Sequence, residues 1–588
     1  MATKKTLRGL LAALCLVLVP ATGLCQQASD TVAPERATGT TAAELVRAKT
    51  YMVAAANPLA ARAGARMLAE GGSAIDAMVA VQTVLGLVEP QSSGIGGGAF
   101  LVYYDAAAKK LTTFDGRETA PMEATPKLFL DAKGQPLKFF DAVVGGRSVG
   151  TPGVVRLMEE THRRYGKLDW KAVLDPAIAL AEGGFEVSPR LAALIAAEEG
   201  RLKTYPGPRE YFYDRDGAPL KPGAVLKNPA YAETLKAIAE GGADAFYKGP
   251  IAEAIVGTVR EAKGNPGVLS LADLSSYRIK EREPLCMSYR AFDVCGMGPP
   301  SSGAAAVGQI LGTIENFDIR ALGSGNAESW RLIGDAQRLA FADRERYLAD
   351  TDFVPAPIDG LMAKDYLGRR ADLLEGVRAL GEDRAKAGEP EWDHALLFGR
   401  DRSIELPSTS HFVIVDPFGN VLSMTTTIEN GFGSRLMTNG FLLNNELTDF
   451  SFETHDNGIP VANRVEPGKR PRSSMSPTIV MKDGRPVLAI GSPGGSQIIG
   501  YVAQALIAWI DWGMNVSEIV AMPHLINRFG PYELEAGTTA EQLAEPLQAL
   551  GYATKTGEMN SGLHAIAIGK DELTGAADPR REGMAVGK

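Results

Sequence analysis

Cysteine and histidine are scarce in this sequence of 588 residues, which contains four of the former and six of the latter. Cys286 and Cys295 have no histidine close to them in the sequence. Protein-bound zinc takes a set of several Cys and His ligands, so this composition argues against a metal site. We expect neither a metal nor a cofactor.

An excess of positive charge and long apolar runs are also absent. The formal net charge is −9, which argues against nucleic-acid binding by bulk charge. After the first 25 residues, no apolar run reaches the length that a membrane span needs. With 45% hydrophobic and 22% charged residues and no internal repeat, the composition is that of a soluble globular protein.

Residues 1–25 have the pattern of a secretory signal peptide. Three basic residues precede Leu10–Val19, an apolar stretch too short to favour a membrane span. The signal would be cut near residues 25–28. Cys25 raises the alternative of a lipid attachment, but Leu24 before it is bulky where a small residue is usual. We expect a periplasmic or secreted protein with no membrane anchor.

Cys286 and Cys295 flank a candidate hairpin. A two-residue loop at Arg290-Ala291 would place the two thiols directly opposite each other. An oxidising compartment would permit a disulfide between them. Two free, half-buried thiols are the alternative, and the sequence leaves both open.

A second candidate hairpin begins at Thr409. Its arms are Ser410–Asp416 and Val421–Ile428, both rich in β-branched residues, and Pro417-Phe418-Gly419-Asn420 supplies the turn. Folding about that turn places Thr427 opposite Thr409 or Ser410, depending on register. A threonine freed to become a chain terminus carries both nucleophile and base, because its α-amine can take the proton from its own Oγ. Ordinary pairing of threonines across strands is the alternative.

Glycine-rich turns punctuate the chain at two places. The strand Val487–Ile490 leads through GSPGGS into an apolar helix from Gln497 to Trp512, an order that aims backbone N–H groups at one point and suits a developing oxyanion. It lacks the Gly-Lys-Ser/Thr of a phosphate loop. The turn Gly94–Gly98 follows a helical stretch and precedes a strand, which is the wrong order for dinucleotide binding.

Elsewhere the apolar spacing predicts a mixture of helices and strands. The elements expected with most definition are helices over Pro58–Glu70, Ser73–Leu87 and Asn326–Leu348, a strand over Phe100–Asp105, and a helix-rich region from Thr151 to Lys280.

The run Thr409–Gly433 (TSHFVIVDPFGNVLSMTTTIENGFG) resembles the signature of the γ-glutamyltransferases, or glutathione hydrolase proenzymes. Further blocks fall in the family's order along nearly the whole chain. They are GIGGGAF from Gly94, FDGRETAP around Arg117, SVGTPG from Ser148, PPSSG from Pro299, FADRERYLAD from Phe341, LLNNE from Leu442, KRP and SSMSPT from Lys469 and Ser473, and GSPGGS from Gly491.

The resemblance implies an α+β fold, the four-layer αββα sandwich of the N-terminal nucleophile hydrolases. It also implies a precursor that cuts itself between Ser408 and Thr409. The large subunit would then be residues 26–408 and the small subunit residues 409–588, with Thr409 at its amino end. Glutathione and other γ-glutamyl compounds are the implied donors, and water, amino acids or peptides are the acceptors.

The same resemblance assigns roles to individual residues. Thr409 would be the nucleophile and Thr427 would orient it, while Gly494 and Gly495 would stabilise the oxyanion. The substrate carboxylate would bind to Arg117, Ser473 and Ser474, and its ammonium to Glu446 and Asp449. Glu429 stands where many members have Asn, and it adds negative charge to the ammonium pocket. We interpret His411 as structural and expect it on the strand face opposite the nucleophile.

Three alternatives remain open from the sequence. A glutaryl acylase acting on β-lactam antibiotics, or a poly-γ-glutamate depolymerase, would use the same fold. An acylase would gain nothing from the acidic pair Glu446 and Asp449, because its substrate has no α-ammonium. A secreted binding protein with a purely structural threonine hairpin would stay as one intact polypeptide.

Overall fold

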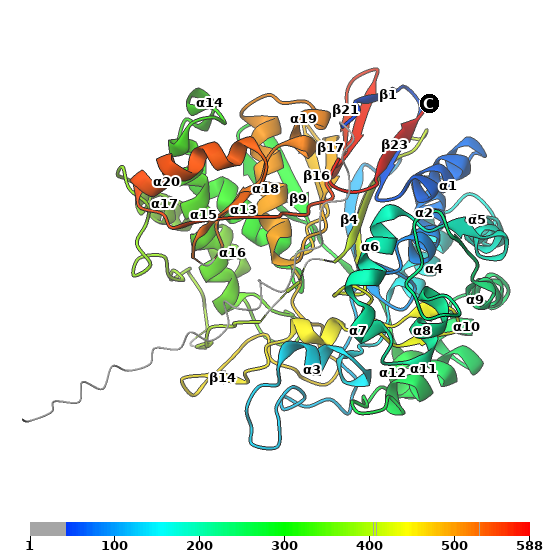
Figure 1. The fold of residues 1–588 in the computed structure, drawn as a ribbon. Helices are drawn as coiled ribbons and strands as arrows, with labels where there is room; N and C mark the ends of the chain where they lie inside the picture. The colour runs from blue at the N-terminus through cyan, green and yellow to red at the C-terminus, as the bar shows by residue number, and fades with distance from the viewer. Residues whose placement is uncertain (1–42, 395, 404, 407, 529) are drawn as a thin grey trace, which may run out of the picture.

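The computed structural model describes residues 43–394, 396–403, 405–406, 408–528 and 530–588 (Figure 1). Its two large sheets each have seven strands. The first, here called the β17 sheet, runs in the order β1 (Val46–Ala48), β22 (Leu573–Ala577), β21 (His564–Ile568), β17 (Arg485–Gly491), β16 (Thr478–Lys482), β9 (Phe292–Gly296) and β8 (Leu285–Tyr289).

The second sheet, here called the β10 sheet, holds the predicted threonine hairpin at its centre. Its order is β23 (Met584–Gly587), β2 (Met52–Ala55), β10 (Ser410–Val415), β11 (Val421–Thr427), β3 (Gly98–Asp105), β4 (Lys110–Gly116) and β7 (Lys280–Arg282). Every pairing in both large sheets is antiparallel. Among the residues that the structure describes, three smaller sheets have two strands each: β5 (Phe185–Glu186) with β6 (Val225–Leu226), β12 (Met437–Thr438) with β13 (Phe441–Leu442), and β14 (His455–Asp456) with β15 (Ile459–Pro460). A further sheet has three strands in the order β18 (Leu525–Ile526), β19 (Tyr532–Glu535) and β20 (Thr554–Gly557).

The two large sheets pack face to face because their strands carry apolar residues on both sides. Along β10, Val413 and Val415 join a cluster with Ile479 and Ala489 of the β17 sheet. The residues between them in sequence, such as Ile414, pack on the other side against the helices that follow β2. This alternation is that of strands buried on both faces.

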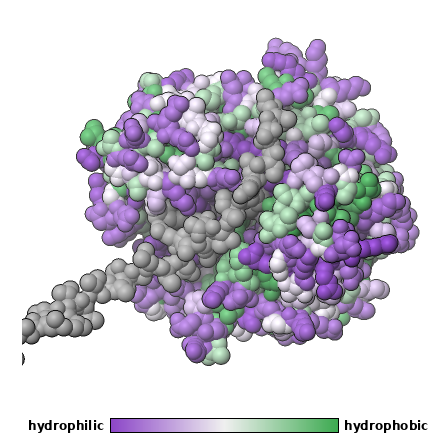
Figure 2. Space-filling view, viewed as in Figure 1, coloured by the Kyte–Doolittle hydropathy of each residue, from purple (hydrophilic) through white to green (hydrophobic). Residues whose placement is uncertain are grey.

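Helices cover the outer face of each sheet (Figure 1). Those on the β10 side include α1 (Pro58–Ala69), α2 (Ala74–Val88), α4 (Val154–Tyr165), α5 (Trp170–Gly183), α6 (Pro189–Ala197), α9 (Pro229–Gly241), α10 (Asp244–Tyr247), α11 (Pro250–Arg260) and α12 (Leu271–Ser276). Those on the β17 side include α13 (Gly303–Ile314), α15 (Ala327–Tyr347), α18 (Ile498–Ile510), α19 (Val516–Ala521) and α20 (Ala544–Leu550). The shorter helices are α3 (Phe139–Val143), α7 (Glu199–Leu202), α8 (Pro206–Phe212), α14 (Ile319–Leu322), α16 (Ile358–Met362) and α17 (Lys364–Asp372). Hydrophilic side chains predominate on the face in Figure 2, with scattered apolar areas between them.

Most predicted elements are confirmed within a few residues. The helices expected over Pro58–Glu70, Ser73–Leu87 and Asn326–Leu348 are α1, α2 and α15, and the strand expected over Phe100–Asp105 is β3. Ser73 begins α2 with a capping box in which its hydroxyl and the Asp76 carboxylate satisfy each other's backbone N–H. The predicted signal peptide, residues 1–25, lies outside the described residues.

The thiols of Cys286 and Cys295 form a disulfide, the first of the two possibilities that the sequence left open. They face each other across the hairpin of β8 and β9, in the register expected for a turn at Arg290-Ala291. Among the described residues, no helix combines the length and the apolar character that crossing a membrane would require.

Candidate active site

The hairpin of β10 and β11 fixes the register that the sequence left open. Ser410 lies opposite Thr426. Thr409 therefore falls beside Thr427, and their Oγ1 atoms are 3.4 Å apart. The predicted meeting of two hydroxyls at the end of the hairpin is confirmed, and the pair is Thr409 with Thr427.

Buried polar groups surround the peptide bond between Ser408 and Thr409. The Thr427 hydroxyl donates to the Ser408 carbonyl oxygen at 3.0 Å, and the Thr409 Oγ1 lies 2.7 Å from the same oxygen. The N–H of Glu429 donates to Thr427 Oγ1 at 2.8 Å, so the hydrogen of that hydroxyl is left for the carbonyl. On the other side of Thr409, Arg581 Nη1 donates to the carbonyl of Thr409 at 2.9 Å. The Ser408 carbonyl is thus held against two hydroxyls.

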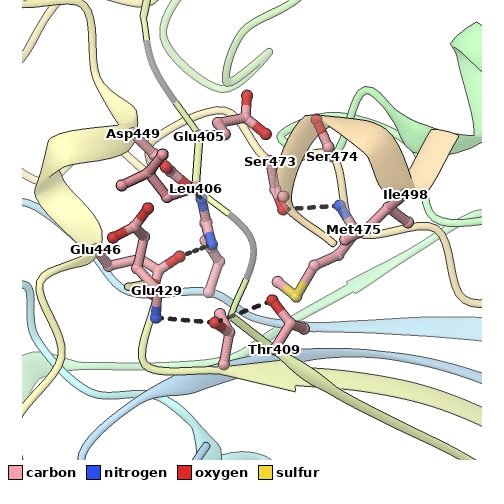
Figure 3. A pocket seen from close by; sticks show the side chains of 13 residues that line it. Glu405, Leu406, Thr409, Glu429, Glu446, Asp449, Ser473, Ser474, Met475 and Ile498 are labelled. Atoms are coloured by element: carbon pink, nitrogen blue, oxygen red, sulfur yellow. Dashed lines mark hydrogen bonds and ion pairs between the residues drawn. The ribbon is translucent and has the colours of Figure 1, made fainter. Parts of the chain in front are cut away.

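A small cavity opens beside this peptide bond (Figure 3). Its volume is about 20 Å³, which is room for a single water molecule. The lining residues are Arg117, Glu405, Leu406, Thr409, Thr427, Glu429, Glu446, Asp449, Ser473, Ser474, Met475, Gly495 and Ile498. The fold therefore brings together all the predicted nucleophile, carboxylate and ammonium residues.

Arg117 is fully buried and is already paired with two predicted ammonium ligands. Its guanidinium donates to Glu446 and, at 2.5 Å, to Asp449. It also donates to the carbonyls of Pro471 and Arg472 at 3.2 and 2.9 Å. Burial raises the pKa of both carboxyl groups, and raises it strongly for Asp449, although Arg117 opposes the shift. Arg117, predicted to bind the substrate carboxylate, is thus already paired with two carboxyl groups predicted to bind the substrate ammonium.

Glu429 follows the nucleophile hairpin directly, with a positive φ of 75°. Its carboxylate accepts from the side-chain amide of Asn445 and from the backbone N–H of Leu406 (Figure 3). Burial, together with the nearby Glu446, raises the pKa of Glu429 to about 8. This carboxyl group therefore changes its charge near neutral pH.

The two predicted serines differ in their partners. Ser473 Oγ accepts from the N–H of Met475 at 3.1 Å, and its carbonyl accepts from the N–H and the hydroxyl of Ser302. Ser474 Oγ accepts from Arg344 Nη2 at 2.7 Å and hydrogen-bonds to the Glu405 carboxylate. Ser474 is thus engaged by an ion pair that the sequence analysis did not foresee.

The predicted glycine turn joins β17 to α18 through a short 3₁₀ turn, Gly495–Gln497. Gly494 and Gly495 have φ values of 139° and 55°, a region that side chains rarely tolerate. A Cβ atom on Gly495 would lie 2.7 Å from the Glu405 carbonyl oxygen and 2.8 Å from that of Leu406. Gly495 therefore reaches the cavity wall, packed against the chain that precedes the nucleophile, whereas Gly494 is not among the lining residues.

The expected orientation of His411 is wrong. Its Nδ1 is 2.9 Å from the Thr425 hydroxyl, and its ring packs on Gly491 of the β17 sheet. Thr425 and Thr427 are two residues apart in β11 and so share one strand face. His411 therefore lies on the same face as the threonine pair, not the opposite one. Burial and the neighbouring His564 hold its pKa well below the usual value, which leaves the ring uncharged.

Sequence reasoning missed five charged residues that shape the site. Arg344 and Arg472 meet the chain just before Thr409, at Glu405 and Asp401, and Arg581 contacts Thr409 itself. Arg344 stands within the quoted block FADRERYLAD, and Arg472 stands between the quoted blocks KRP and SSMSPT, which is the one signal that could have singled them out. No local pattern indicates that Glu405 or Arg581 approaches Thr409.

A protein-family model described as gamma-glutamyltranspeptidase matches residues 60–588. The chain belongs to the γ-glutamyltranspeptidase family. A relative in the family, the glutathione hydrolase proenzyme of Bacillus subtilis strain 168, is 38% identical over 552 residues, 92% of each chain. The glutathione hydrolase proenzyme of Escherichia coli K12 is 37% identical over 91% of each chain.

The fold has a solved counterpart. The crystal structure of cephalosporin acylase from Bacillus halodurans superposes with a TM-score of 0.81 at 26% identity and covers 95% of this chain and 99% of its own. The family that the sequence motifs predicted is thus confirmed along almost the whole chain.

Proposed function

We propose that the protein matures by cutting itself before Thr409 and then transfers γ-glutamyl groups through that threonine. As a member of its family it is a γ-glutamyltransferase and glutathione hydrolase. The observation that carries the assignment of Thr409 is the pair of hydroxyls on the Ser408 carbonyl, with Thr427 Oγ1 at 3.0 Å and Thr409 Oγ1 at 2.7 Å.

Self-cleavage uses groups already in contact. Thr409 Oγ attacks the Ser408 carbonyl carbon, and the Thr427 hydroxyl hydrogen-bonds to the oxygen on which negative charge develops. The C–N bond breaks, the proton from Oγ passes to the departing nitrogen, and an ester links Ser408 to Thr409 Oγ. Water hydrolyses the ester and leaves a carboxylate on Ser408 and a free α-amine on Thr409.

The two resulting pieces are residues 26–408 and 409–588, after removal of residues 1–25 as a signal peptide. The two face-to-face sheets with helices on their outer faces support the four-layer αββα sandwich of N-terminal nucleophile hydrolases. A basic and apolar leader supports a periplasmic or secreted location without a membrane anchor.

In the mature enzyme the freed α-amine of Thr409 is the general base, because such amines titrate near ~8. Thr409 Oγ attacks the γ-carbonyl of the donor, and the amine passes the proton to the leaving group. Gly494 and Gly495 donate backbone N–H groups to the oxyanion, each worth about 3 kcal/mol in comparable sites. Water or the amine of an amino acid or peptide then takes the acyl group from the threonine.

The charges that line the cavity match the free end of a γ-glutamyl donor. Its α-carboxylate would bind to Arg117, Ser473 and Ser474. Its α-ammonium would lie among the carboxylates of Glu429, Glu446 and Asp449. Because these carboxylates are buried, their electrostatic attraction for an incoming ammonium is much stronger than it would be at the protein surface.

A glutaryl acylase is the second candidate, because a cephalosporin acylase shares the fold. A glutaryl group carries a carboxylate but no ammonium, so it would leave Glu429, Glu446 and Asp449 uncompensated. The buried acidic cluster therefore favours the γ-glutamyl donor. Rates on γ-glutamyl-p-nitroanilide and on a matched glutaryl amide decide between the two.

Two measurements test the proposal. Denaturing gels of purified protein should give two bands, and Edman sequencing of the smaller should begin at Thr409. Thr409→Ala should give one uncut band without turnover of glutathione, with or without an acceptor dipeptide. Two bands from that variant, or a full-length chain that still consumes glutathione, would overturn the proposed mechanism.

A further inference from the structure

Three of the ion pairs formed by the described residues tie down the chain that leads into the cleavage site. Arg400 pairs with Glu345 at 2.5 Å, and Asp401 pairs with Arg472 at 2.8 Å. The third pair, between Glu405 and Arg344, is the last before Thr409 and is buried on both sides. Arg400, Asp401 and Glu405 are therefore fixed by specific contacts as the chain approaches the peptide bond to be cut.

The Glu405 carboxylate lies in the cavity where a donor carboxylate would bind. Arg344 Nη2 donates both to Glu405 and to Ser474 Oγ, and Ser474 in turn hydrogen-bonds to the Glu405 carboxylate. Arg344 Nε is held at 2.7 Å by the hydroxyl of Ser302, so the guanidinium cannot turn away without losing that bond. Burial disfavours the charged form, but Arg344 and Arg472 together hold the pKa of Glu405 below its ordinary value.

The next residue occupies the other end of the same cavity. The N–H of Leu406 donates to Glu429, a proposed ligand for the donor ammonium (Figure 3). Its carbonyl packs against Gly495, a proposed oxyanion donor. Before cleavage, one dipeptide therefore fills the carboxylate end with Glu405 and the ammonium end with a backbone N–H.

We propose that Glu405 is the positioning residue for self-cleavage, held by Arg344 and Ser474 so that the Ser408 carbonyl stays on the hydroxyls of Thr409 and Thr427. The inference rests on the proposed self-cleavage and assigns the anchor that aligns it. Reactions of this kind depend on near-attack geometry, and a misplacement of about 1 Å can cost roughly a hundredfold in rate. Three residues separate Glu405 from the nucleophile, so the anchor leaves the chain little slack.

The anchor is also suited to release after the cut. Glu405 shares the cavity with Glu429, Glu446 and Asp449, and its negative charge adds to the rise in pKa of Glu446 and Asp449. Cleavage adds a further carboxylate at Ser408, whose carbonyl lies against Thr409 and Thr427 of the same cavity. Like charges in a buried site repel, so the new chain end is driven out and Ser474 becomes free to bind a donor.

The experiment follows the rate of self-cleavage of full-length chains made in a cell-free extract, sampled over time on denaturing gels. Glu405→Gln keeps the size and removes the charge, and we expect cleavage about tenfold to a hundredfold slower than in the wild type. Glu405→Asp restores the charge and should recover most of that loss. Glu391→Gln changes an exposed glutamate upstream on the same chain and should cut at the wild-type rate.

To check folding, each substitution is also made in the uncut Thr409→Ala background, and the midpoint of thermal unfolding is measured for each variant. Should Glu405→Gln not fold, Arg344→Lys carries the test, because lysine keeps the charge but cannot bridge Glu405 and Ser474 with a planar fork. Slow cleavage of that variant supports the anchor. A folded Glu405→Gln or Arg344→Lys variant that cuts itself at the wild-type rate would overturn the proposed role of Glu405. A Glu405→Asp variant that is as slow as Glu405→Gln would overturn it as well. A wild-type chain that is never cut would instead refute the proposed function itself.

Discussion

Glu429 gives the sharpest quantitative prediction, because its pKa of about 8 lies far from the ordinary value of 4.5. A carboxyl group that binds its proton more tightly in the folded chain destabilises the fold once it must ionise. The free energy of unfolding should therefore fall as the pH rises from about 4.5 to 8, and the loss should be complete above 8. At about 1.4 kcal/mol per pKa unit, a difference of 3.5 units sets a ceiling of about 5 kcal/mol.

Glu429→Gln removes this titration and keeps an oxygen that can accept from the N–H of Leu406. In the uncut Thr409→Ala background, urea unfolding followed by tryptophan fluorescence at pH 5 and pH 8.5 measures the effect. The Gln variant should lose several kcal/mol less between the two pH values and be the more stable at pH 8.5. Glu391→Gln, at an exposed position, serves as the control. An identical pH dependence in parent and Gln variant would refute the reasoning.

Three further predictions concern the same cavity. Thr427→Val keeps the shape of the side chain but loses the hydroxyl that contacts the scissile carbonyl, so it should slow self-cleavage about a hundredfold on gels. Thr427→Ser should restore most of the rate. Equal rates in the wild type and both variants would show that this contact does not contribute to cleavage. Arg117→Met leaves Glu446 and Asp449 without a positive partner, so it should raise the donor KM. It should also lower the free energy of unfolding in urea by about 3–5 kcal/mol, with a larger loss at pH 8.5 than at pH 5. An unchanged KM would remove Arg117 from the proposed donor site. Donor binding should favour ionised Glu429, so the donor KM should fall as the pH rises towards 8, and Glu429→Gln should flatten that slope.

Local sequence patterns predicted the elements that carry the site. The alternation and turn residues of the Thr409 hairpin specify two strands, and the glycine turn before α18 specifies a strand, a turn and a helix. The register of the hairpin was open by one residue, because the first arm is apolar on both faces, so the pattern alone does not exclude a slip that would move the side chains of one arm to the opposite face. The packing of β10 between two layers settles it, since Val413 and Val415 must face the β17 sheet.

The prediction that His411 lies on the strand face opposite Thr409 was also wrong. Thr409 directly precedes Ser410, the first residue of β10. The extended chain continues through Thr409, because the hydroxyl of Thr409 meets that of Thr427 just beyond the end of β10. Residues 409 and 411 are two apart, so they share a face.

The ion pairs of the cavity were beyond any local pattern. Glu405 and Arg344 are 61 residues apart, and Arg117 and Glu446 are 329 apart, so only the tertiary path of the chain joins them. The blocks of family resemblance identified Arg117 and Glu446 but gave no sign that they pair before a substrate arrives.

The charges of the cavity give a physical account of why cleavage and donor choice depend on the same residues. Before the cut, Arg117 balances Glu446 and Asp449 only in part, and burial keeps protons on the remaining acid groups. A donor that brings a carboxylate and an ammonium would add no net charge to the buried site. A donor with a carboxylate alone would add a negative charge to a site in which Arg117 is already paired with Glu446 and Asp449. We therefore expect the excess of buried carboxylates to favour the γ-glutamyl group and, after the proposed cut, to repel the new carboxylate of Ser408.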